Sequence, residues 1–79
     1  MNIIWSKNDC MYCDKAKALM RFKNLPYEER NIEGGQWTMQ QLAESVPGAR
    51  SFPQIVMDGK IVGGFDELYT LLTVGELSL

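Results

Sequence analysis

Histidine is absent from this 79-residue chain, and cysteine occurs only twice. Without histidine the chain lacks the commonest general base and the commonest metal ligand, so every Cys–His or Ser–His catalytic pair is excluded. A structural zinc site would have to combine the two cysteines with carboxylates, which is rare. We therefore expect no metal site, and the two cysteines become the first candidates for chemistry.

Clustered positive charge and long apolar runs are also missing. The eight Lys and Arg residues form no run and the formal net charge is −2, whereas phosphate binding needs a concentrated positive face. No stretch approaches the roughly 20 apolar residues of a membrane span, and the first residues resemble no secretion signal. Apolar residues, 46% of the total, are spread along the chain. We expect a single cytoplasmic domain over residues 1–79, monomeric, with neither nucleic acid nor membrane as a partner.

Apolar periodicity and turn residues divide the sequence into seven elements. Strands are predicted at 2–5, 27–32, 54–57 and 60–62, and helices at 10–23, 38–46 and 65–74. Thr38 and Gln41 have the spacing of a capping box, and Asp58-Gly59 is a strong hairpin signal. The apolar stripes of the second and third helices comprise Met39, Leu42, Ala43 and Val46, and Leu68, Leu71 and Leu72.

The element order is β-α-β-α-β-β-α. The first β-α-β unit requires a right-handed parallel crossover, and the last two strands form an antiparallel hairpin. The charged second strand suits the edge of the sheet. The sequence thus predicts an α/β protein with a four-stranded mixed sheet flanked by three helices, the thioredoxin-like fold.

The two cysteines, Cys10 and Cys13, lie three residues apart in a Cys-Met-Tyr-Cys motif. Residues with this spacing on a helix are roughly 5 Å apart at Cα, close enough for a disulfide. Cys10 lies at the mouth of the first helix, where unpaired N–H groups and the helix dipole favour a thiolate, and Lys7 adds positive charge nearby. We expect Cys10 to attack and Cys13, one turn further in, to resolve. A buried inert pair or a static disulfide is the alternative, and the spacing disfavours it.

Three separated segments resemble the glutaredoxin family. Residues 7–13, Lys-Asn-Asp-Cys-Met-Tyr-Cys, resemble the family's Lys-x-x-Cys-Pro-Tyr-Cys site. Residues 51–55, Ser-Phe-Pro-Gln-Ile, resemble its Thr-Val-Pro-Gln-Ile loop, and residues 63–68, Gly-Gly-Phe-Asp-Glu-Leu, its Gly-Gly-x-Asp-x-Leu turn. Each match is weak alone, but their order and spacing are specific. The chain is most similar to small dithiol glutaredoxins of bacteria and their viruses.

The resemblance implies a thiol–disulfide oxidoreductase that uses glutathione. Pro53 would follow a cis peptide bond, and the backbone of Phe52 would pair with the cysteinyl part of glutathione. The γ-glutamyl carboxylate would meet the N–H groups of Phe65 and Asp66 at the start of the third helix, and the Asp66 carboxylate would meet the γ-glutamyl amine.

The remaining contacts come from the first loop and helix. Lys7, with Arg50, would bind the glycyl carboxylate, and Tyr12 would form a wall of the glutathione pocket. Simpler interpretations stay open: Asp66 suits a helix N-cap, Lys7 a solvated loop, and Phe52 and Phe65 the core. We expect Trp5 and Trp37 to be packing residues.

Met11 stands where the family has proline. In glutaredoxins this proline stiffens the loop and hinders assembly of an iron–sulfur cluster, whereas methionine does not fix φ. By this resemblance, one interpretation of Met11 is a [2Fe–2S] cluster held by Cys10 and glutathione from two chains; a tolerated loop residue is the simpler interpretation. Two rival functions are a redoxin reduced by thioredoxin reductase and a non-catalytic iron–sulfur carrier. The redoxin usually has Ala-Pro-Val and Trp-Ser-Gly-Phe segments, which this chain lacks. The resemblance implies protein disulfides and glutathione mixed disulfides as substrates, with ribonucleotide reductase as the usual client.

Overall fold

The computed structural model describes residues 1–77, and its elements follow the predicted order. They are β1 (Asn2–Ser6), α1 (Met11–Phe22), β2 (Glu28–Asn31), α2 (Met39–Ser45), β3 (Gln54–Met57), β4 (Lys60–Gly63) and α3 (Phe65–Leu77). The predicted capping box at Thr38 and Gln41 is present at the start of α2. α3 is longer than predicted, because Gly75 does not end the helix.

The four strands form one mixed sheet in the order β2-β1-β3-β4. β1 and β2 are parallel, as a crossover through α1 requires, and β3 is antiparallel to both β1 and β4. β2 is an edge strand, as its charge predicted. Asp58 and Gly59 both have positive φ, 50° and 81°, which is the conformation of a tight two-residue hairpin turn. The predicted fold class is therefore confirmed.

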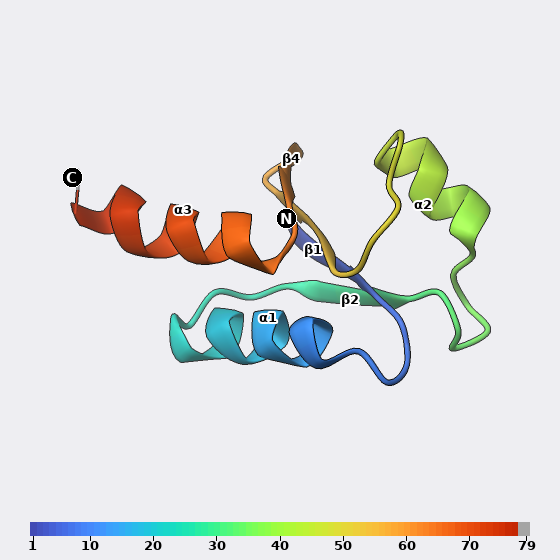
Figure 1. The fold of residues 1–79 in the computed structure, drawn as a ribbon, viewed down its shortest axis with the longest axis horizontal. Helices are drawn as coiled ribbons and strands as arrows, with labels where there is room; N and C mark the ends of the chain where they lie inside the picture. Colours follow the sequence, from blue (N-terminus) through green and yellow to red (C-terminus); the bar gives the residue numbers. More distant parts are fainter. Residues whose placement is uncertain (78–79) are drawn as a thin grey trace.

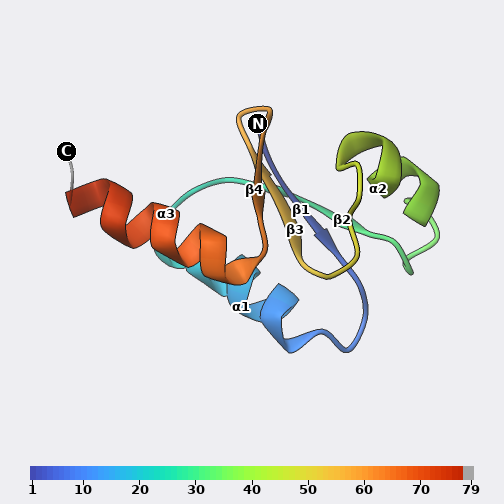
Figure 2. The same ribbon diagram turned by 45° about the horizontal axis from the view of Figure 1, so that its top comes forward.

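The helices cover both faces of the sheet: α1 and α3 lie together on one face and α2 lies on the other (Figures 1 and 2). The alternation of side chains along β1 and β3 creates both cores. Ile4 and Ile55 face α1 and α3, while Trp5 and Val56 face α2. The α1/α3 core also contains Ala16, Met20, Leu68 and Leu72, and the α2 core contains Leu42 and Val46.

Two of the predicted apolar stripes are wrong in part. On α2, Leu42 and Val46 are buried but Met39 and Ala43 are exposed, because this short helix touches the sheet along a narrow face. On α3, Leu68 and Leu72 are buried whereas Leu71 is exposed. Leu71 lines the open groove between α3 and the edge strand β4. The buried faces are narrower than the apolar stripes in the sequence.

A polar cluster fastens α1 to the two parallel strands. The buried Ser6 hydroxyl donates to Glu29 Oε2 at 2.7 Å, and the Lys17 ammonium approaches the same oxygen at 2.9 Å. Partial burial alone would raise the pKa of Glu29. The hydrogen bonds from Ser6 and Lys17 and the charge of Lys17 outweigh that effect, so this pKa lies below its ordinary value of 4.5. The hydrogen bond to Glu29 raises the pKa of Lys17 above 10.5. Both residues are therefore charged at neutral pH.

We expect Glu29→Gln to lower the free energy of unfolding at neutral pH by up to about 1 kcal/mol, since the Glu29 side chain is 35% exposed and solvent weakens the pair. A carboxylate whose pKa is lowered by folding stabilises the protein above its ordinary pKa, and this contribution is lost as the pH falls through the lowered value. The difference between the variant and the parent protein should thus shrink below pH 4.5. Urea titrations across the acidic range measure it. Glu44→Gln, on the exposed side of α2, is the control; an equal effect there would mean that net charge, not this cluster, is responsible.

Candidate active site

The loop before the first cysteine is fixed to the end of β2. The Asn8 N–H donates to Glu33 Oε1 at 2.7 Å, and Asn31 Nδ2 donates to Asn8 Oδ1 at 3.0 Å. Asp9 adopts a positive φ of 52°, which turns the chain into the helix. The sequence analysis missed these two hydrogen bonds of Asn8, with Glu33 and with Asn31. The available signal was their position, because polar residues following two adjacent parallel strands meet at one edge of a sheet.

Cys10 is the N-cap of α1 and Cys13 lies in the first turn. The Cys13 N–H donates to Cys10 Sγ at 3.2 Å. The two sulfurs form a disulfide with the Cα atoms 5.2 Å apart, close to the predicted separation. Cys13 is fully buried while Cys10 is partly exposed, which is the expected difference. In the reduced protein the same N–H would face the Cys10 thiolate, because it has no acceptor within the helix.

The loop before β3 supplies the second wall of the site. The Phe52–Pro53 peptide bond is cis, as the resemblance to glutaredoxins implies, and Pro53 is buried. Gln54 Nε2 donates to the Ser51 carbonyl at 2.9 Å, which holds this loop against the first residue of β3. Phe52 packs partly against the core on the α2 side of the sheet.

The start of α3 forms the third wall. Gly63 has a φ of 121°, and a Cβ there would lie 3.1 Å from the Glu67 side chain, so glycine is required. The Gly64 N–H donates to Glu67 Oε1 at 2.7 Å. The helix begins at Phe65, so Gly64 and not Asp66 is in the N-cap position. The alternative interpretation of Asp66 as an N-cap is therefore wrong: it lies in the first turn, with the N–H groups of Phe65 and Asp66 lacking acceptors within the helix.

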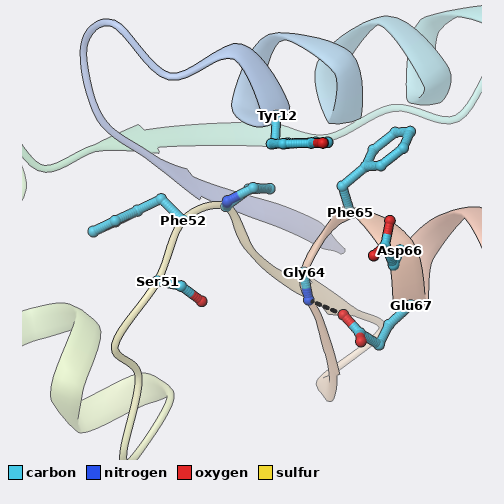
Figure 3. A pocket seen from close by; sticks show the side chains of 8 residues that line it. Tyr12, Ser51, Phe52, Gly64, Phe65, Asp66 and Glu67 are labelled. Carbon is cyan, nitrogen blue, oxygen red and sulfur yellow. Dashed lines mark hydrogen bonds between the residues drawn. The ribbon is translucent and has the colours of Figure 1, made fainter.

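These walls enclose a pocket of about 180 Å³ beside the N-terminus of α1. In Figure 3, Tyr12 closes one side, Ser51 and Phe52 lie across from Gly64, and Phe65 points toward α1. The lining consists of Tyr12, Ser51, Phe52, Pro53, Gly64, Phe65, Asp66 and Glu67. All five pocket residues predicted in α1, α3 and the Pro53 loop are thus brought together.

Lys7 and Arg50 lie outside the pocket lining. The Lys7 ammonium lies 5.7 Å from the centroid of the ring of Phe52, a residue that lines the pocket. Arg50 is exposed on the preceding loop. Three lining residues, Ser51, Gly64 and Glu67, were not among the predicted contacts, and Glu67 is the charged one. Its signal was the Gly-x-x-Glu spacing, which places a carboxylate at the third helical position, where it can accept from the capping residue's N–H.

Trp5 and Trp37 pack together as expected, with ring centroids 5.6 Å apart. Within residues 1–77, no group of three or more His, Cys, Asp or Glu side chains is arranged to hold a metal ion. None of the helices in the same range is both long and apolar enough to cross a membrane.

A parallel β-α-β unit joined to an antiparallel hairpin, with a cysteine pair at the first turn of α1, defines a thioredoxin-like dithiol protein. The Glutaredoxin family model matches residues 2–62. Glutaredoxin 3 of Escherichia coli K12 is 35% identical over 74 residues, covering 94% of this chain and 88% of that protein. Glutaredoxin 1 of Rickettsia conorii is 38% identical over 78 residues, covering 95% and 74%. This chain belongs to the glutaredoxin family and is a thiol–disulfide oxidoreductase.

Solved structures agree with this assignment. The glutaredoxin of Brucella melitensis superposes with a TM-score of 0.75 at 35% identity, covering 98% of this chain and 83% of that one. The buckwheat glutaredoxin–glutathione complex has a TM-score of 0.80 at 24% identity, with 98% and 72% coverage, and shows the same fold.

The difference in exposure between the two cysteines predicts different chemical roles. We expect Cys10→Ser to abolish disulfide exchange, while Cys13→Ser retains turnover of glutathione mixed disulfides, which need only one attacking sulfur. In the reduced protein, iodoacetamide in mildly acidic buffer should label Cys10 first, as peptide mass spectrometry would measure. Faster labelling of Cys13 would show that the assigned roles are reversed.

Proposed function

We propose that this protein reduces glutathione mixed disulfides and protein disulfides in the cytoplasm, with glutathione as its reductant. The pocket beside the dithiol is the observation that carries this proposal, because it offers both kinds of partner that the γ-glutamyl end of glutathione needs. That end carries a carboxylate and an ammonium group side by side. A site for it must therefore combine hydrogen-bond donors with a negative charge.

The start of α3 supplies this combination. The N–H groups of Phe65 and Asp66 would bind the γ-glutamyl carboxylate, helped by the positive end of the helix dipole. The Asp66 carboxylate would bind the ammonium. Glu67 already accepts from Gly64, which leaves Asp66 as the carboxylate for the ligand.

The rest of the tripeptide would extend toward Lys7. The backbone of Phe52, just before β3, would pair with the cysteinyl part as an added strand does. The Lys7 ammonium, which lies over the ring of Phe52, would attract the glycyl carboxylate. Tyr12 lies over the pocket and would shield the sulfur from solvent.

The reaction follows from the helix position of Cys10. Its thiolate attacks the glutathionyl sulfur of a mixed disulfide; the new bond joins Cys10 to glutathione, and the substrate thiolate leaves and takes up a proton. A second glutathione thiolate then attacks the bound glutathione sulfur, which releases oxidised glutathione and the Cys10 thiolate. The N–H of Cys13 stabilises that thiolate, so Cys10 is a good leaving group. With a protein disulfide, the Cys10 thiolate first attacks one substrate sulfur and forms a mixed disulfide with the protein. Cys13 then attacks the Cys10 sulfur, which forms the Cys10–Cys13 disulfide and releases the reduced protein. Two glutathione thiols reduce that disulfide and leave as oxidised glutathione.

The choice of reductant distinguishes this proposal from a redoxin served by thioredoxin reductase. We expect the protein to reduce the mixed disulfide of glutathione and cysteine when coupled to glutathione and glutathione reductase. Coupling to thioredoxin reductase should support little turnover, because that reductant has no γ-glutamyl group with which to bind the pocket. NADPH consumption measures both rates in parallel. Faster turnover with thioredoxin reductase would favour the redoxin.

Substitutions in the pocket test the glutathione contacts. Asp66→Ala and Lys7→Ala should each raise KM for the mixed disulfide about five- to tenfold, with kcat nearly unchanged, since each removes a charged contact remote from the reacting sulfur. Glu44→Ala and Lys60→Ala remove the same charges from exposed positions on α2 and β4 and should have no effect. Exchange with dithiothreitol should be unchanged in all four variants; slower exchange would indicate damage to the fold instead.

A further inference from the structure

A row of three aromatic rings runs from the active site onto the outer face of α3. The ring centroids of Tyr12 and Phe65 are 5.9 Å apart, and those of Phe65 and Tyr69 are 6.1 Å apart. We call these three residues the aromatic ladder. Tyr12 and Phe65 line the pocket, whereas Tyr69 lies beyond its lining. The ladder therefore starts in the pocket and continues outside it.

Packing in the α1/α3 core accounts for only part of the ladder, because Phe65 is partly buried against that core whereas Tyr12 and Tyr69 are exposed. Leu68 and Leu72, which are buried with Ala16 and Met20, join the two helices. Tyr12 is 48% exposed and Tyr69 is 52% exposed. Exposed aromatic rings in a continuous row are typical of a surface that binds another protein, because they offer a large contact area at little cost in conformational entropy.

We propose that the ladder binds the protein part of a mixed-disulfide substrate, and that Tyr69 selects for protein substrates over small ones. This inference rests on the proposed function, in which the glutathionyl group of the substrate fills the pocket. The substrate protein is attached through the second sulfur of the same disulfide, that of its own cysteine, and extends from there onto the ladder. The ladder begins with Tyr12, two residues after Cys10, so it is continuous with the point of attack. Tyr69 lies outside the lining of the pocket that the glutathionyl group would fill, so a small mixed disulfide would not contact it.

The geometry also indicates the chemistry of the partner. Phe65 and Tyr69 are four residues apart on one face of α3, so their rings form one apolar strip. Such a strip fits an apolar or aromatic side chain close to the modified cysteine of the substrate. Tyr69 is then a positioning residue, because it contacts the substrate away from the sulfur that reacts.

The test compares two substrates that share the glutathionyl group, namely glutathionylated serum albumin and the mixed disulfide of glutathione and cysteine. We expect Tyr69→Ala to raise KM for the albumin about five- to tenfold, from the loss of one aromatic contact. KM for the small disulfide and kcat for both should stay unchanged. Tyr69→Phe should retain the KM of the parent protein, because it keeps the ring.

Phe22→Ala is the matched control, since Phe22 is an aromatic residue with 79% exposure at the far end of α1; it should change neither KM. Equal effects of Tyr69→Ala on both substrates, or none on albumin, would overturn the proposal. So would a dimer of the parent protein that Tyr69→Ala dissociates, because a second copy would then cover the ladder. If the parent protein reduces neither substrate, the proposed glutathione chemistry fails, which is a separate outcome.

Discussion

The first turn of a helix leaves backbone N–H groups without acceptors, and in this protein one of them, that of Cys13, donates to Cys10 Sγ at 3.2 Å. That hydrogen bond exists only because α1 begins at the residue after Cys10. The helix start is in turn set by the loop from β1, which Asn8 ties to the end of β2. The reactivity of one sulfur thus depends on where a strand ends and a helix begins.

The second helix start, that of α3, matters for a different reason. The hairpin of β3 and β4 returns the chain to the end of the sheet where β1 ends and α1 begins. There Gly63 and Gly64 turn the chain directly into α3. The Tyr12 ring at the start of α1 and the Phe65 ring at the start of α3 therefore lie close together, with their centroids 5.9 Å apart. The start of α1 faces the Cys10 sulfur, and the start of α3 leaves N–H groups without acceptors in the helix, which in the proposed function bind a carboxylate. The sheet holds these two helix starts side by side.

Much of the fold was predictable because its signals are local. The strand positions, the Thr38 capping box and the Asp58-Gly59 turn each depend on a few neighbouring residues, and all are present close to where they were predicted. The apolar stripes were less reliable. Leu71 and Met39 are exposed although their spacing suits a buried face, since burial depends on which part of the helix another element covers, and that is not encoded within the helix itself.

The sequence by itself determined the dithiol: the spacing of Cys10 and Cys13 and their place after a strand are properties of a short segment. The resemblance to glutaredoxins added the Pro53 loop and the Phe65–Asp66 turn. Only the tertiary structure decided that the Tyr12 ring meets the Phe65 ring and that Tyr69 continues the row of rings. These contacts join residues whose side-chain directions follow from how α3 docks on the sheet and α1, and a linear pattern does not contain that docking.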